Sequence, residues 1–155
     1  MTLKSEVDQV FLAAVESGNI RYTVEPALAL GTLLVSDGVV GAWAWAPYIQ
    51  VVAAAVIPDP CWLCGISYHT GVVGTIEGDV AVAIGAALAE VDIAIFHIVS
   101  GIPTAVGVSV NAPALLPYPI RIVGTPRLAV RLAKSTGAGA EGCSVKVILA
   151  QAVGA

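Results

Sequence analysis

The sequence predicts an all-β protein, an antiparallel β-sandwich or barrel that follows one short helix. Aliphatic residues recur with the two-residue period of strands from Ile20 onward, and turn-forming residues interrupt them at spacings of roughly ten residues. Helical periodicity is confined to the N-terminal segment. Many short strands at this spacing are typical of sandwiches and barrels, and 155 residues suffice for one domain with a single core.

The N-terminal helix is predicted from one apolar face. Ser5 is a suitable N-cap and Gly18 a suitable stop. The face has the spacing i, i+3, i+4, i+7, i+8 and consists of Val7, Val10, Phe11, Ala14 and Val15. We expect this helix to pack on its own domain, the alternative being an arm that reaches another subunit. The predicted organisation is a helix or arm over residues 1–19 and a β-sandwich domain over residues 20–155.

The predicted strands are short runs rich in Val, Ile, Leu and aromatic residues, bounded by turns such as Asp37-Gly38 and Glu77-Gly78. In 127–132, for example, Arg127 and Arg131 share one face and the leucines share the other, which predicts one core face and one solvated or interfacial face. The predicted strands cover residues 20–24, 31–36, 39–45, 49–56, 61–68, 79–84, 91–98, 104–110, 118–123, 127–132 and 143–150.

The composition is poor in charge. Only 12% of the residues are charged and 57% are hydrophobic, whereas an average soluble domain carries about 25% charged residues. Much of the surface is therefore expected to contact other protein. The net charge of −4 argues against nucleic acid as a partner, because phosphate binding depends on Lys and Arg.

The charges are unevenly distributed along the chain. Residues 1–100 contain ten acidic and two basic groups, whereas residues 101–155 contain five basic groups and one acidic group. Two copies of such a chain can meet head to tail, and this heterologous contact generates rings such as trimers. The alternative is pairing of the same charges within one molecule.

Two stretches without charge, 38–58 and 98–120, are long enough to cross a bilayer as helices. Both contain prolines, which break helices, and both are rich in Val and Ile, which favour strands. We therefore expect no membrane partner. The chain starts without the pattern of a secretory signal peptide and has an odd number of cysteines, so we expect synthesis in the cytoplasm and free thiols.

Signals for catalysis, cofactors and metals are weak. Residues 137–142 match G-x-G-x-x-G, but a strand pattern follows where a dinucleotide-binding fold needs a helix. Cys61 and Cys64 lie three apart, which places them on opposite faces of a strand, so we expect buried structural cysteines and no zinc site. Two pairs of carboxylates, Glu77 with Asp79 and Glu90 with Asp92, leave a calcium site as an alternative to solvated charges. We expect no enzyme and no cofactor.

Trp43 and Trp45 are two residues apart and would share one face of a strand. We expect them in the core, where aromatic residues contribute heavily to burial. If they were exposed, they would form a platform for a sugar or a protein partner.

Two stretches, Asp79–Glu90 and Leu116–Ala138, resemble a pattern in β-sandwich, jelly-roll-like structural proteins of tailed bacteriophage virions. In that pattern an alternating strand reaches a Gly-Ala-Ala turn ending in Glu, and a later Pro-Ile-Arg-Ile strand leads through a Gly-Thr turn into an Arg-aliphatic-Ala strand. The match covers roughly residues 75–150, and proline follows the glycine here instead of preceding it. The resemblance implies a jelly roll in a virion component such as a capsid decoration protein or a fibre or tail-tip module.

The function predicted is therefore that of a capsid decoration protein, made in the host cytoplasm, whose partners are its own copies and the major capsid protein. A fibre or tail-tip module that binds a receptor or a carbohydrate is the alternative, and a membrane protein is a weaker one. A homo-oligomer, such as a trimer, would grip several lattice sites at once. The residues predicted to make these contacts are Val7, Val10, Phe11, Arg121, Arg127 and Arg131.

Overall fold

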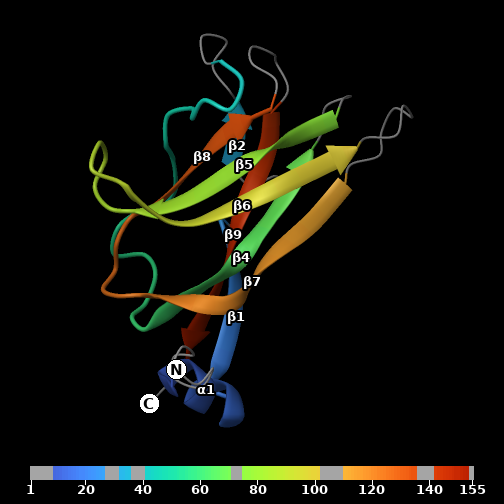
Figure 1. The fold of residues 1–155 in the computed structure, drawn as a ribbon. Helices are drawn as coiled ribbons and strands as arrows, with labels where there is room; N and C mark the ends of the chain where they lie inside the picture. Colours follow the sequence, from blue (N-terminus) through green and yellow to red (C-terminus); the bar gives the residue numbers. More distant parts are fainter. Residues whose placement is uncertain are drawn as a thin grey trace, which may run out of the picture.

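The computed structural model describes residues 9–26, 32–35, 41–70, 75–101, 110–135 and 142–153. One helix and nine strands lie in these ranges (Figure 1). They are α1 (Gln9–Glu16), β1 (Ile20–Glu25), β2 (Thr32–Val35), β3 (Ile49–Val52), β4 (Cys61–Thr70), β5 (Thr75–Ile84), β6 (Val91–Gly101), β7 (Val110–Ile122), β8 (Leu128–Lys134) and β9 (Gly142–Ala152).

The strands form two antiparallel sheets. Sheet A has the order β1-β9-β4-β7, with β2 beside the other half of β9, and sheet B has the order β3-β8-β5-β6. If β1 and β2 are counted as one broken strand, the strands pair from the two ends of the chain inward. The β1–β2 strand pairs with β9, β3 with β8, β4 with β7, and β5 with β6. This pairing is that of a jelly roll, a long hairpin wound into a sandwich. The predicted antiparallel β-sandwich is confirmed.

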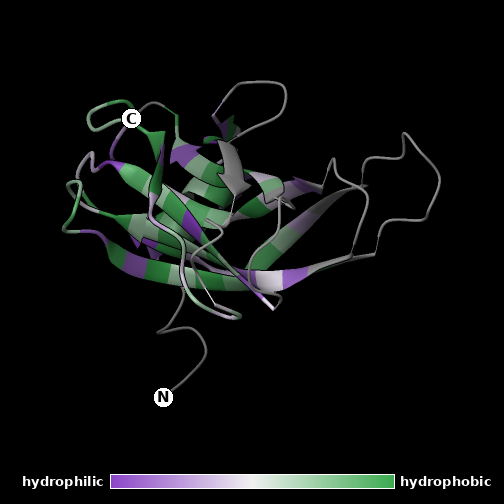
Figure 2. Ribbon diagram, turned by 90° about the horizontal axis from the view of Figure 1, so that it is seen from above, coloured by the Kyte–Doolittle hydropathy of each residue, from purple (hydrophilic) through white to green (hydrophobic). Residues whose placement is uncertain are grey.

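The core lies between the two sheets. It is built from alternate residues of each strand, such as Val80 and Val82 of β5 and Val145 and Val147 of β9. Hydrophobic residues predominate along the strands, and hydrophilic ones are few and scattered (Figure 2). The pattern matches the low charge content of the sequence.

The helix α1 lies at one end of the sandwich, beside the ends of β1 and β9 (Figure 1), and contacts outward-facing residues of sheet A. Phe11 meets Trp62 edge to face, with 5.4 Å between ring centres, and Trp62 is fully buried as a result. Trp62 belongs to the outer face because its neighbours Cys61 and Leu63 point into the core. The prediction that the helix packs on its own domain is confirmed.

Two predicted strands were wrong, and so was the predicted turn Glu77-Gly78, which lies inside β5 because both residues pair with β6. The segment predicted as strand 39–45 turns back between Gly41 and Ala44, with Trp43 in the left-handed region at a φ of 59°, and only Trp45 forms a bridge to a strand. Strand 49–56 ends at Val52. The predicted strand 118–123 forms the end of a longer strand, β7, which begins at Val110. β7 tolerates its prolines because it is an edge strand of sheet A. Residues 36–40 and 102–109 lie outside the described ranges.

Candidate interaction surfaces

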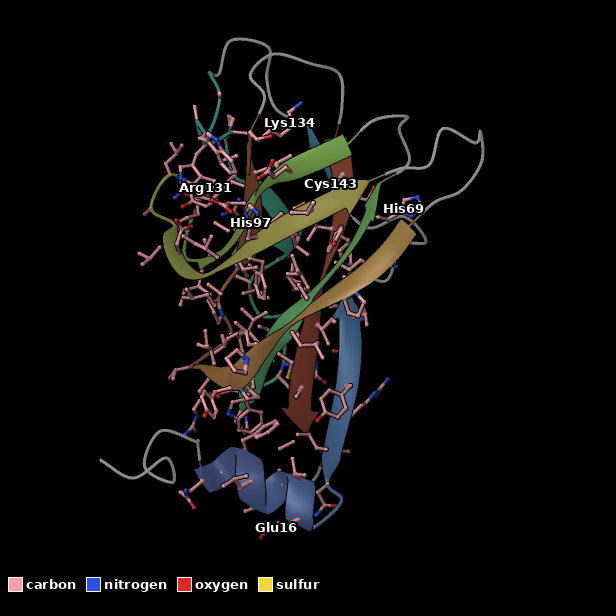
Figure 3. All side chains as sticks on the ribbon, turned by 45° about the vertical axis from the view of Figure 1, so that its right-hand side comes forward. Glu16, His69, His97, Arg131, Lys134 and Cys143 are labelled. Atoms are coloured by element: carbon pink, nitrogen blue, oxygen red, sulfur yellow. The ribbon has the colours of Figure 1, made fainter. Side chains whose placement is uncertain are left out.

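The outer face of sheet B has a floor of small residues. Ala81, Ala83, Ala129 and Ala133 alternate with core residues and therefore point away from sheet A, yet all four are buried. Longer charged and aromatic side chains around these alanines shield them from solvent. Figure 3 shows two of these, Arg131 and His97, near each other at sheet B and far from Glu16 in α1.

Arg131 is held between two aromatic rings. Its guanidinium carbon lies 4.5 Å from the ring centre of Trp45 and 4.5 Å from that of Tyr48. Its Nη2 atom pairs with Asp92, whose other oxygen accepts a hydrogen bond of 2.8 Å from the Tyr48 hydroxyl. Burial raises the pKa of Tyr48, and the hydrogen bond to Asp92 raises it further.

Arg127 forms a second cluster on the same face. Its Nη1 atom donates to Glu90 over 2.6 Å, and its Nε atom donates to Gln50 over 2.9 Å. The hydrogen bond from Arg127 lowers the pKa of Glu90. The Arg127–Glu90 and Arg131–Asp92 pairs connect the acidic part of the sequence to its basic part within one molecule. For these four residues, the charges therefore pair within the chain, which was the alternative to pairing between two copies.

His97 contacts the carboxylates of Glu77 and Asp79 and the indole of Trp43. Its Nδ1 atom is 2.8 Å from Oδ1 of Asp79, and its Nε2 atom is 3.9 Å from Oε1 of Glu77. The indole of Trp43 stacks on the imidazole at 6.1 Å, nearly parallel, and Trp43 is 46% exposed. The expectation that Trp43 lies in the core was therefore wrong. Its side chain was placed there on the assumption of a regular strand, and the turn at 41–44 directs it outward.

Together with two exposed residues of β6, this cluster forms what we call the acidic patch, which lies on the outer face of sheet B over β5 and β6. Cross-strand pairs connect it: Asp79 opposite His97, and Glu77 opposite Val99. The acidic patch comprises Trp43, Glu77, Asp79, Ile95, His97 and Val99. Within the described ranges, no group of His, Cys, Asp or Glu is arranged to hold a metal ion.

The outer face of sheet A is different, because an apolar row crosses it. Val24, Ile148, Gly65 and Leu115 lie opposite one another on β1, β9, β4 and β7. Val24 is exposed, and Leu115 is 66% exposed. A Cβ atom on Gly65 would approach the carbonyl oxygen of Ala114 to 2.3 Å, so only glycine fits in the middle of this row.

Basic residues border the apolar row. Lys146 lies on β9 two residues from Ile148, and Arg121 lies on β7 opposite Trp62. Exposed Tyr22 lies on β1 on the same face. We call the apolar row with Tyr22, Arg121 and Lys146 the basic patch. None of the outward-facing strand positions whose side chains are described in sheet A is acidic.

The three cysteines are free and buried, as predicted. Cys61 faces the core and Cys64 faces the outer side of sheet A, so the two thiols lie on opposite faces of β4. Burial raises the pKa of Cys61 to about 11 and that of Cys143 to about 12. These thiols are therefore protonated and unreactive at neutral pH.

The residues predicted to make contacts do not form one surface. Val7 lies outside the described ranges, and Phe11 is packed on Trp62. Val10 is exposed and borders a shallow apolar hollow of about 300 Å³ between α1 and the end of β9. Arg127 and Arg131 lie on sheet B and Arg121 on sheet A. A role for these six residues in contacts with other molecules stays a prediction.

Sequence reasoning did not find the partners of Tyr48 and His97 or the apolar row. Alternation does signal that His97 and Val99 share a face. It does not reveal which strands are neighbours, and the apolar row exists only because four strands distant in sequence are aligned. Within the described ranges, no helix is long and apolar enough to cross a membrane.

No protein-family model and no curated protein matches this sequence. Solved structures that are similar to it include those titled "Structure of infectious bursal disease virus Gx strain" and "Structure of infectious bursal disease virus Gt strain". The first shares 17% identity with a TM-score of 0.38 over 84% of this chain and 31% of that chain. The second shares 14% identity with a TM-score of 0.37 over 86% of this chain and 33% of that chain. The chain thus spans about a third of their length.

Proposed function

We propose that this chain is a structural protein of a virus particle, a capsid decoration protein that associates with its own copies and attaches to the shell. The observation that carries this proposal is the apolar row across the outer face of sheet A. Val24 and Leu115 are exposed in a chain in which only 12% of the residues are charged. Large apolar side chains gathered on one face mark an interaction surface.

The energetics favour contact with another protein. Full burial of an aliphatic side chain contributes about 1.5–3 kcal/mol. Val24, Leu115 and Tyr22 are between 43% and 66% exposed, so their coverage contributes roughly 1 kcal/mol apiece. A standard interface buries about 800 Å² per partner. That is close to a tenth of the 8178 Å² accessible surface of this chain, so the outer face of one sheet can supply it.

The occupant of this surface is a second copy of the chain. The basic patch carries positive charge and no described carboxylate at the outward-facing positions of its strands, whereas the chain as a whole has a net charge of −4. A copy of the same molecule therefore supplies the complementary charge. The resulting oligomer, a trimer in the simplest case, binds repeated sites on the major capsid protein, and multivalency converts weak contacts into stable attachment.

Multi-angle light scattering tests self-association. Leu115→Asp places a charge in the apolar row and should shift the population to monomers. Leu88→Asp is the matched control, because Leu88 is fully exposed in the loop between β5 and β6, outside the basic patch. The proposal fails if the wild-type protein is a monomer at every concentration, or if the two variants behave alike.

A second function, recognition of a receptor carbohydrate, is favoured by the exposed indole of Trp43. A sugar ring can stack on an indole while Glu77 accepts hydrogen bonds from its hydroxyl groups. A glycan array followed by tryptophan quenching with acrylamide tests it. A glycan that protects the wild-type fluorescence, but not that of Trp43→Ala, would support this function. Uniform quenching with every glycan would exclude it.

A further inference from the structure

We infer that the contact between copies is heterologous: the basic patch of one copy docks on the acidic patch of the next. This inference rests on the proposed function, because it names the second half of the same interface. It assigns Trp43, Glu77 and Asp79 to a contact between copies.

The acidic patch has the composition of a docking surface. Ile95 and Val99 point outward from β6 on either side of His97 and are each 57% exposed. Glu77 and Asp79 lie beside them on β5, with Glu77 about half exposed. Two carboxylates next to apolar residues match a surface that carries basic residues next to apolar ones.

Trp43 adds a second argument. A bulky residue at a φ of 59° is an outlier, and such strain costs about 1–3 kcal/mol. The strained turn is fixed by a 2.6 Å hydrogen bond from the Trp43 amide to the carbonyl oxygen of Lys134. The strain places the indole over His97, where nearly half of Trp43 remains in solvent. Tryptophan is among the residues most enriched in interface hot spots.

Charge decides how the copies are oriented. In an isologous dimer through sheet A, Lys146 and Arg121 of one copy would lie against the same residues of the other. In an isologous dimer through sheet B, Glu77 and Asp79 would do so. Both arrangements place like charges together, whereas the contact between the basic and the acidic patch pairs opposite charges.

The positions of the two patches determine what the contact builds. The acidic patch lies on the outer face of sheet B, on β6 and its inner neighbour β5, and the basic patch lies on the outer face of sheet A. A heterologous contact between these faces repeats from copy to copy. It closes a ring where the rotation between copies divides a full turn and builds an open filament where it does not, and a trimer is the smallest ring.

Charge reversal tests this inference. Lys146→Glu and Glu77→Lys should each weaken assembly at least tenfold, because each places like charges in the contact. The double variant in one chain restores opposite charges and should restore the wild-type mass. In an equimolar mixture of the two single variants, only contacts between unlike variants pair opposite charges, so the mixture should form heterodimers or other even-numbered assemblies and should not regain the mass of a trimer. Glu16→Lys on exposed α1 is the control for the change in net charge.

The outcomes separate the two proposals. If the wild-type protein assembles but the double variant does not regain its mass, the heterologous contact is wrong and self-association stands. If the single variants assemble like the wild type, the inference is equally overturned. If the wild-type protein never assembles, the proposed function itself fails. Circular dichroism of each variant shows whether the sandwich is folded.

Discussion

Tyr48 and Arg131 share one carboxylate: the phenol of Tyr48 donates to Asp92, and the guanidinium that lies over its ring pairs with the other oxygen of the same group. Tyr48 precedes β3 and Arg131 belongs to β8, whereas Asp92 belongs to β6 at the opposite edge of the sheet. The three residues thus connect the two edges of sheet B across the buried alanines of its outer face.

Arg131→Ala should destabilise the protein by about 1–3 kcal/mol, because it removes the cationic partner of the partly buried Asp92 carboxylate and two cation–π contacts. Tyr48→Phe removes one hydrogen bond and should cost about 1 kcal/mol. Urea unfolding measures both values, and Arg21→Ala, at an exposed residue of β1, is the control. Equal stability of Arg131→Ala and Arg21→Ala would refute the structural role of the cluster.

Phe11→Ala should release the helix from sheet A. The substitution removes the ring that covers Trp62 and should lower the free energy of unfolding by about 2 kcal/mol. Hydrogen exchange of the α1 amides should accelerate, and the fluorescence of Trp62 should become accessible to quenchers. Val15→Ala, on an exposed side of the same helix, should leave both signals unchanged.

Gly65→Ala should destabilise sheet A by roughly 2 kcal/mol or more, because its Cβ atom would collide with the backbone of β7 and that backbone must shift. Gly41→Ala is the matched control, since nothing lies within 4 Å of the Cβ position there. Thermal unfolding compares the two. A Tm for Gly65→Ala at or above that of Gly41→Ala would contradict the described register of β4 and β7.

The buried thiols predict a loss of stability at high pH. The folded state raises the pKa of Cys61 to about 11 and that of Cys143 to about 12, from an ordinary value near 9. The folded state therefore keeps protons that the unfolded state releases above about pH 9, and each thiol lowers the free energy of unfolding by about 1 kcal/mol per pH unit there. Urea unfolding at several pH values should give a shallower decline for the Cys61→Ala, Cys143→Ala double variant. Identical slopes would contradict the burial of these thiols.

Local patterns predicted most of the fold. Alternation located β4, β5, β6, β8 and β9, and the Gly124-Thr125 turn between β7 and β8 is present, with Gly124 at a φ of 75°. The interaction surfaces were less accessible to prediction because they depend on strand order. Val24 and Leu115 are distant in sequence and lie in one row only because β9 and β4 separate their strands. Trp43 was misplaced because its turn contains none of the usual Pro, Asn or Asp residues at its centre.

Sedimentation equilibrium of the wild-type protein over a wide concentration range tests most directly whether the exposed faces of this sandwich are contacts between copies. We expect a mass that is a whole multiple of the 15.7 kDa chain and that falls toward the chain mass as salt weakens the charged contacts. A species of 15.7 kDa at every concentration and salt would contradict the account.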